Sequence, residues 1–225
     1  MQTTIKVLTV GSLTGLLFAV GLRLTWVEIR QALRQRGLAW VVIANFVAVP
    51  ALAVLAVRAF ALPREIAVAM LLLAAAPFAP AVPIFTKLSR GNLALAAGLT
   101  AVFPFLSALL TPLACVISFK AIPGSGYVEF SPGTILMVLF CTITLPLTFG
   151  AAVNHWLPAW RGVLLRPVEM ISECAGAASL ALVTVAELPS ILGVGGRALL
   201  AMALLCEAWM VLGWMLGGNG PGSRA

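Results

Sequence analysis

The chain has 225 residues and a formal net charge of +7, and 62% of its residues are hydrophobic while only 9% are charged. Soluble domains carry about 25% charged residues, so this composition excludes a water-exposed globular domain and predicts an integral membrane protein. The basic excess does not indicate a nucleic-acid partner, because the Lys and Arg residues flank apolar runs. The cysteines lie far apart in different runs, which excludes a disulfide framework and a metal-binding spacing.

Seven apolar runs approach the length of about 20 residues that a membrane-spanning helix needs. In chain order they are Val7–Leu22, Leu38–Val57, Ile66–Thr86, Leu93–Phe119, Thr134–Val153, Ile171–Leu192 and Ala198–Leu216. The predicted fold class is therefore all-α, a polytopic transmembrane helical bundle that forms a single transmembrane domain over residues 1–225. The longest predicted connections are Arg23–Gly37, Lys120–Gly133 and Asn154–Met170. Gly11 and Gly15 have a spacing that favours close helix packing.

The third run contains Pro77, Pro80 and Pro83, which are spaced by three residues. Each proline removes a backbone donor and clashes with the carbonyl four residues earlier, so an unbroken helix is excluded. Freed carbonyls at membrane depth must be bonded by protein or by water in a cavity, and broken helices of this kind form midplane sites in secondary transporters. The alternative is that Pro83 simply ends the helix, since Lys87 follows closely. We interpret the three prolines as a candidate binding region.

Orientation is predicted from the distribution of Lys and Arg between the two sides. The more basic side carries Arg23, Arg30, Arg34, Arg36, Lys87, Arg90, Arg161, Arg166 and Arg224. The other side carries Lys6, Arg58, Arg64, Lys120 and Arg197. The more basic side is expected to be cytoplasmic, so the N-terminus lies outside and the C-terminus inside. In a bacterium this would be the inner membrane.

Two polar residues within the predicted spans are candidates for binding an ion or a solute. Glu207 lies near the middle of the seventh run, where an ionised carboxylate is costly. It is either a proton carrier or a neutral acid bonded to a neighbouring helix. Asn45 lies in the middle of the second run, and interhelical hydrogen bonding competes with ion binding as its role. Glu169 lies close to Arg166, and an interfacial ion pair is expected there.

Several segments resemble the bile acid:sodium symporter family. Phe18–Thr25 is similar to its Gly-Leu-x-Leu-Thr signature, and Asn45–Ala53 to its Gln-Phe-x-x-x-Pro-Leu-Leu-Ala helix. Ala76–Pro83 falls where the family has Cys-Pro-Gly-Gly-Thr-Ala-Ser-Asn. The segments Gly91–Leu95, Leu99–Val102 and Leu110–Leu113 are similar to the helix that follows. The resemblance covers about residues 14–116 by motif, and the later half by pattern.

The resemblance implies a fold of two inverted repeats, arranged as a panel domain and a core domain with two crossing broken helices. The seven runs correspond to the second through eighth of ten family helices, so this chain is expected to lack the first and the last two. Because the ninth helix is the partner of the break at Pro77–Pro83, the chain alone is expected to be an incomplete transporter. A truncated gene or a half-transporter that forms a homodimer would each account for this.

The resemblance also assigns the sodium ligands and shows where this chain departs from them. The Ser-Asn pair of the first break is Val82 and Pro83 here, and the serine of the next helix is Ala96. The threonine one turn later is kept as Thr100, and a glutamine of the second sodium site is replaced by Asn45. Sodium, a hard cation, needs several oxygen ligands. Sodium dependence is therefore expected to be weak or absent, which leaves a proton as the other candidate coupling ion.

The predicted function is secondary transport of an organic anion or similar small solute across the lipid bilayer. The candidate ion- or solute-binding residues are Asn45, Pro77, Pro80, Pro83, Thr100 and Glu207. A seven-helix receptor or a non-transporting membrane protein is the alternative, although the seventh run has no lysine to hold retinal. An enzyme is not expected, because the sequence has no Asp and no His-Glu-x-x-His motif. No organic cofactor and no metal site other than the coupling ion is expected.

Overall fold

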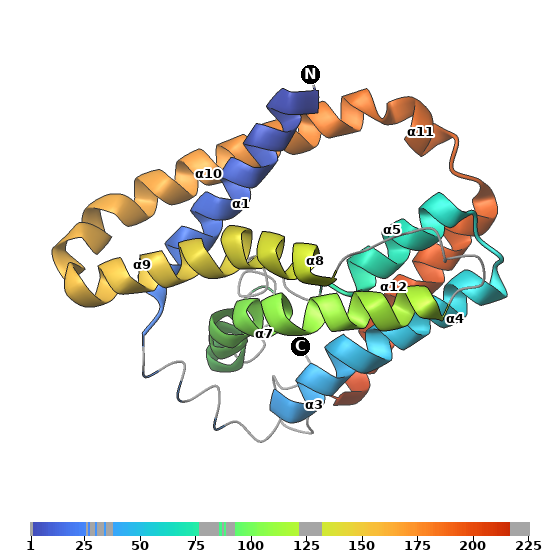
Figure 1. Ribbon diagram of the computed structural model, residues 1–225, viewed down its shortest axis with the longest axis horizontal. Helices are drawn as coiled ribbons and strands as arrows, with labels where there is room; N and C mark the ends of the chain where they lie inside the picture. The colour runs from blue at the N-terminus through green and yellow to red at the C-terminus, as the bar shows by residue number, and fades with distance from the viewer. Residues whose placement is uncertain are drawn as a thin grey trace. The chain divides into compact units, whose positions relative to one another are not determined.

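The computed structural model describes residues 2–25, 38–76, 93–121 and 132–216, together with the single positions Val27, Arg30, Arg34, Thr86 and Leu88. Every regular element among these residues is helical (Figure 1). Six of the helices in this part of the chain are long and apolar enough to cross a membrane. The prediction of an all-α polytopic bundle is therefore confirmed.

The helices form two compact units that interleave along the chain. Unit 1 comprises Met1–Ile29 and Met137–Val194, and unit 2 comprises Arg30–Leu136 and Gly195–Ala225. The helices of unit 1 are α1 (Gln2–Arg23), the π-helical turn η3 (Phe140–Thr144), α9 (Leu145–Trp156), α10 (Pro158–Ala186) and α11 (Leu188–Leu192). The helices of unit 2 are α3 (Leu38–Ile43), the π-helical turn η1 (Ala44–Ala48), α4 (Val49–Ala59), α5 (Arg64–Ala74), α7 (Leu93–Lys120) and α12 (Gly196–Leu216). Helix α8 (Pro132–Leu139) contains the boundary between the two units, which falls between Leu136 and Met137.

In unit 1, α1 packs against both α9 and α10 (Figure 1). Gly21 of α1 and Gly150 of α9 face each other so closely that a Cβ on Gly21 would lie 2.2 Å from the Leu147 carbonyl oxygen. Small residues allow this approach, which gives helices in lipid their van der Waals contact. Leu17 and Leu22 of α1 are fully buried beside this contact.

Hydroxyl groups and one ion pair tie α1 to α10. The Ser12 hydroxyl donates to the Ser172 carbonyl over 2.6 Å, and the Thr9 and Ser179 hydroxyls lie 2.6 Å apart. At the end of α1, Arg23 forms an ion pair with Glu169, with 2.5 Å between Nη2 and Oε1. Glu169 therefore pairs across the unit with Arg23 and not with Arg166.

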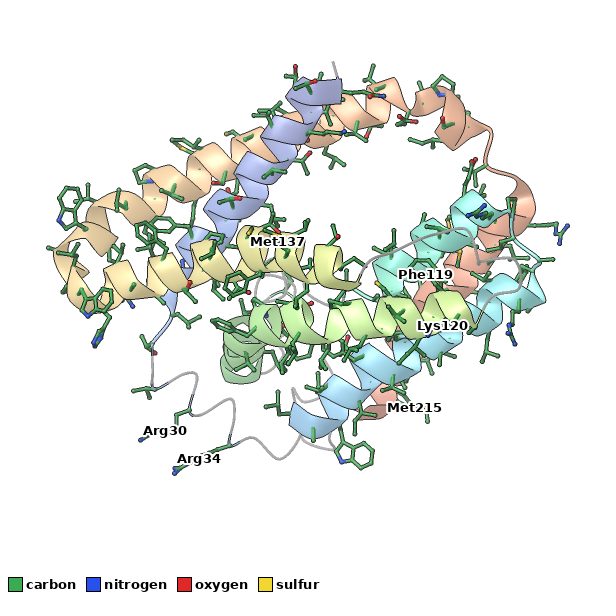
Figure 2. The ribbon with its side chains drawn as sticks, in the orientation of Figure 1. Arg30, Arg34, Phe119, Lys120, Met137 and Met215 are labelled. Atoms are coloured by element: carbon green, nitrogen blue, oxygen red, sulfur yellow. The ribbon has the colours of Figure 1, made fainter. Side chains whose placement is uncertain are left out.

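Unit 2 has an apolar core where α4, α5, α7 and α12 meet. Its fully or nearly fully buried members include Ala53, Val57, Met70, Leu71, Ala74, Cys115, Phe119 and Leu205. The ends of these helices are joined by guanidinium groups. Arg58 of α4 donates to the carbonyl of Ala121, next to Lys120 at the end of α7 (Figure 2), and Arg197 of α12 donates to the Phe60 carbonyl over 2.5 Å.

The surface of both units is apolar. Met137 and Met215, labelled in Figure 2, each expose 69% of their area, and many Leu, Val, Ile, Phe and Trp side chains are similarly exposed. Water-soluble proteins rarely expose contiguous apolar surface on this scale. Such a surface is suited to contact with the hydrocarbon interior of a lipid bilayer.

Several helix bounds differ from the predicted spans. The prediction of a connection over Asn154–Met170 is wrong, because α9 continues to Trp156 and α10 begins at Pro158. Hydropathy marks where lipid contact begins, whereas the helix continues through the polar turns that contain Arg161 and Arg166. In the third run, α5 ends at Ala74, before the first proline, and residues 77–85 lie outside the described residues.

Two prolines follow wide helical turns. In η1 the Val49 amide bonds to the Ala44 carbonyl five residues earlier, immediately before Pro50. In η3 the Leu145 amide bonds to the Phe140 carbonyl in the same way, immediately before Pro146. The second and fifth predicted spans thus share one structural feature, a π-helical turn followed by a proline. Such π-helical turns are frequent at functional sites.

Candidate functional site

A row of hydroxyl groups runs along the buried side of α7 in unit 2. Thr100, Ser107, Thr111 and Ser118 are exposed by only 8%, 5%, 7% and 3%. Their spacing of one or two helical turns places them on a single face of the helix. Uncharged polar groups at membrane depth are costly unless they are hydrogen-bonded. The hydrogen-bond partners of these hydroxyls therefore indicate their structural roles.

Thr111 bonds to the point where α5 stops. Its hydroxyl donates to the Ala75 carbonyl over 2.8 Å, and the Ser107 hydroxyl lies 3.3 Å from that of Thr111. Ala75 is fully buried and directly follows the last residue of α5. The residue before a proline disfavours helical geometry, which explains why the helix ends ahead of Pro77. The Ala75 carbonyl, at the end of α5, thus accepts a hydrogen bond from the neighbouring helix α7.

Asn45 lies in the π-helical turn η1, on an element that contacts α7. Its side-chain nitrogen donates to the Val41 carbonyl in its own helix over 2.8 Å. A carbonyl oxygen can accept only from the NH₂ group of an amide, so this bond uses the side-chain nitrogen of Asn45 and not its side-chain oxygen. The neighbouring Phe46 stacks on Phe103 of α7, with ring centroids 6.0 Å apart.

Thr100 lies one turn before Phe103, so the aromatic contact brings its part of α7 beside the turn that holds Asn45. The Thr100 hydroxyl donates to the Ala96 carbonyl over 2.8 Å. Its single proton is used in this bond, and its lone pairs remain as acceptors. Asn45 and Thr100 therefore lie on two elements of unit 2 that contact each other, and both side chains carry an oxygen atom.

The remaining candidates lie elsewhere. Glu207 is on α12 of the same unit, but its side chain is exposed, and no ion pair to it is found within the described residues. Pro77, Pro80 and Pro83 lie outside the described residues. No group of three or more His, Cys, Asp or Glu side chains that could hold a metal ion occurs in the described part of the chain.

Ser107 and Thr111 are not among the residues predicted from the sequence as site candidates. Thr111 occurs there only within the segment Leu110–Leu113, which resembles a family helix. A usable signal existed, because Thr100, Ser107, Thr111 and Ser118 recur at helical spacing within an otherwise apolar run. That spacing predicts a shared face, but it does not predict that Thr111 reaches the end of α5.

Apolar spans, an apolar surface and an internal row of bonded hydroxyls define an integral, multi-pass helical membrane protein. The sequence model of the sodium bile acid symporter family matches residues 12–193. The chain belongs to this family, which confirms the predicted resemblance.

A curated relative is the "Uncharacterized sodium-dependent transporter YocS" of Bacillus subtilis (strain 168). It is 26% identical over 140 residues, which cover 62% of this chain and 42% of the relative. The chain thus spans less than half the length of this relative.

Proposed function

We propose that this protein acts in secondary transport and moves an organic anion or a similar small solute across the membrane. The match of the family model over residues 12–193 is the observation that carries this proposal. The local chemistry supports it, because the end of a helix that stops ahead of three prolines is bonded by a hydroxyl of a neighbouring helix. Broken helices whose freed backbone groups are bonded inside the protein are how secondary transporters build their sites.

The two compact units fit the panel and core domains that the family resemblance implies. Unit 2 contains α5, which is the first part of the Pro-broken run, and we assign this unit to the core. Unit 1, in which α1, α9 and α10 pack through glycine and serine contacts, is assigned to the panel. In alternating access, one rigid bundle moves against another around a fixed site.

We infer that sodium coupling is weak in this protein. At the position where the family has a serine ligand, the buried Ala96 offers only a methyl group, although its backbone carbonyl accepts the Thr100 hydroxyl. Val82 and Pro83 supply no side-chain oxygen either. Among the family's ligand positions that fall on described residues, Asn45 and Thr100 keep a side-chain oxygen, and a hard cation takes several oxygen ligands. The name of YocS points to sodium for that protein, whereas Glu207 makes a proton the alternative here.

The transport proposal is tested with the purified protein in liposomes. Uptake of a radiolabelled bile acid and of smaller organic anions is measured under a sodium gradient, a proton gradient and no gradient. Gradient-driven uptake above that of protein-free liposomes is expected for at least one anion. Uptake equal to that of the protein-free liposomes for every anion and gradient would contradict the proposal.

Orientation gives a separate prediction, for which two glycines form a matched pair. Gly162 and Gly195 are both exposed, and a Cβ at either would meet no atom within 4 Å. In a cysteine-free background in intact cells, Gly195→Cys should react rapidly with a membrane-impermeant thiol reagent. Gly162→Cys, which lies beside Arg161, should react only after the cells are opened. The reverse pattern would invert the predicted topology.

A further inference from the structure

The hydroxyl of Thr111 donates to a carbonyl outside its own helix. Thr100, Thr142 and Thr184 each donate to the carbonyl one turn back in their own helix. This is the usual bond of a helical threonine. Thr111 donates instead to Ala75 of a different helix, 36 residues earlier in the chain. The bond therefore fixes one helix relative to another and does not merely satisfy the hydroxyl.

The bond belongs to a relay with a defined direction. A threonine hydroxyl has a single proton, and that of Thr111 is given to the Ala75 carbonyl. In the contact between Thr111 and Ser107, Ser107 must therefore be the donor, over 3.3 Å. All three residues are buried. The relay runs from Ser107 to Thr111 and ends on the carbonyl that directly follows α5.

Ala75 lies where the helical pattern of α5 stops, because α5 ends at Ala74 and Ala75 is its C-cap. Carbonyls at the C-terminal end of a helix lack partners within that helix. The amides of Ala75 and Ala76 bond back to Leu71 and Leu73. Thr111 thus supplies a bond from another helix at the end of α5, ahead of Pro77 in the chain.

We propose that Thr111, oriented by Ser107, is a positioning residue that anchors the end of α5 and thereby sets the affinity of the transport site for its solute. This inference rests on the proposed transport function. A hydroxyl that holds the carbonyl of the C-cap residue fixes the end of α5 against α7. Loss of the hydroxyl releases the end of α5 without removing any side chain that we assign to the binding of ion or solute.

The test uses the full chain with Thr111→Val, which keeps the shape of the side chain and removes the hydroxyl, and with Thr111→Ser, which restores the hydroxyl. Thr184→Val is the matched control, because its hydroxyl bonds only within its own helix. The first readout is hydrogen–deuterium exchange of the Ala75 and Ala76 amides in lipid nanodiscs. We expect exchange several-fold faster in Thr111→Val, and unchanged exchange in Thr111→Ser and Thr184→Val.

The second readout is the KM for uptake of a radiolabelled bile acid, or of the anion that the wild type transports best, per amount of monodisperse protein. We expect KM to rise several-fold in Thr111→Val and to return in Thr111→Ser, whereas a purely structural defect would only reduce the amount of folded protein. If Thr111→Val is not monodisperse, Ser107→Ala takes its place, with a smaller effect of the same sign.

Two results would overturn the inference: exchange at Ala75 and Ala76 that is the same as in the wild type, or faster exchange with KM unchanged. If the wild type transports no anion, the transport proposal and the affinity role built on it both fail. The exchange measurement then still decides whether Thr111 anchors α5.

Discussion

Replacing Gly21 by alanine is expected to force α1 away from α9 and to destabilise unit 1. The added Cβ would lie 2.2 Å from the Leu147 carbonyl oxygen, 2.9 Å from the Ala151 nitrogen and 3.0 Å from the Gly150 Cα. These are backbone atoms, which cannot rotate aside as a side chain can. Overpacking of a well-packed interior costs about 1–3 kcal/mol and occasionally more, and we expect a loss of about 3 kcal/mol or above here.

Gly11 provides the matched control on the same helix. A Cβ at Gly11 would meet no atom within 4 Å, and alanine is the better helix former, so Gly11→Ala should be neutral or slightly stabilising. Thermal unfolding of the two variants in the same detergent makes the comparison, and Gly21→Ala should unfold at a clearly lower temperature. Equal unfolding temperatures would mean that α1 and α9 do not approach each other as described.

Replacing Glu207 by glutamine is expected to abolish uptake that is driven by a pH gradient, if a proton is the coupling ion. Glu207 is the one carboxyl group within the predicted α12 span, and glutamine has a similar shape but cannot bind and release a proton at this position. An ionised carboxylate in hydrocarbon is costly, so a carboxyl group within a membrane span is a candidate for function.

Glu187→Gln is the control for this variant, because Glu187 lies at the break between α10 and α11, is exposed, and accepts a bond from Ser190. Both variants should elute as monodisperse protein and unfold at the wild-type temperature. Uptake driven by a pH gradient should be lost only in Glu207→Gln. If both variants keep that uptake, Glu207 has no part in coupling.

The sequence predicts the fold class well because lipid imposes one rule on every span. A helix must cover about 20 apolar residues, and the runs beginning near Val7, Leu38 and Leu93 correspond to α1, to α3 with η1 and α4, and to α7. The proline triplet likewise predicts a stop, and α5 ends before it. These properties depend on single segments, which local patterns describe.

The contacts between helices could not be predicted from such local patterns. The Gly11 and Gly15 spacing predicts one packing face, yet of these two only Gly15 faces a neighbour, the Ser172 side chain, while the close approach of two backbones is made by Gly21 and Gly150. Periodicity shows which residues share a face but does not identify the helix that the face contacts.

The same limit applies to charges and to the candidate site. Arg23 and Glu169 form an ion pair across 146 residues, although Arg166 is much nearer in sequence. Of the candidate site, Asn45 and Thr100 could be named from the sequence because they replace or keep polar residues of a family motif. Thr111 could not be named from the sequence, because its role depends on its distance from the backbone carbonyl of Ala75. Every residue has such a carbonyl, so the residue type at position 75 does not indicate the contact.

We propose that this member of the family moves solute with a depleted sodium site. Uptake of an organic anion is measured in liposomes that contain the protein, with sodium outside replaced stepwise by choline at constant pH and membrane potential. The initial rate should change little as sodium is removed, and a proton gradient alone should support uptake. A steep dependence on sodium, with no uptake in choline, would rule out a depleted site and would mean that other oxygens complete the site around Asn45 and Thr100.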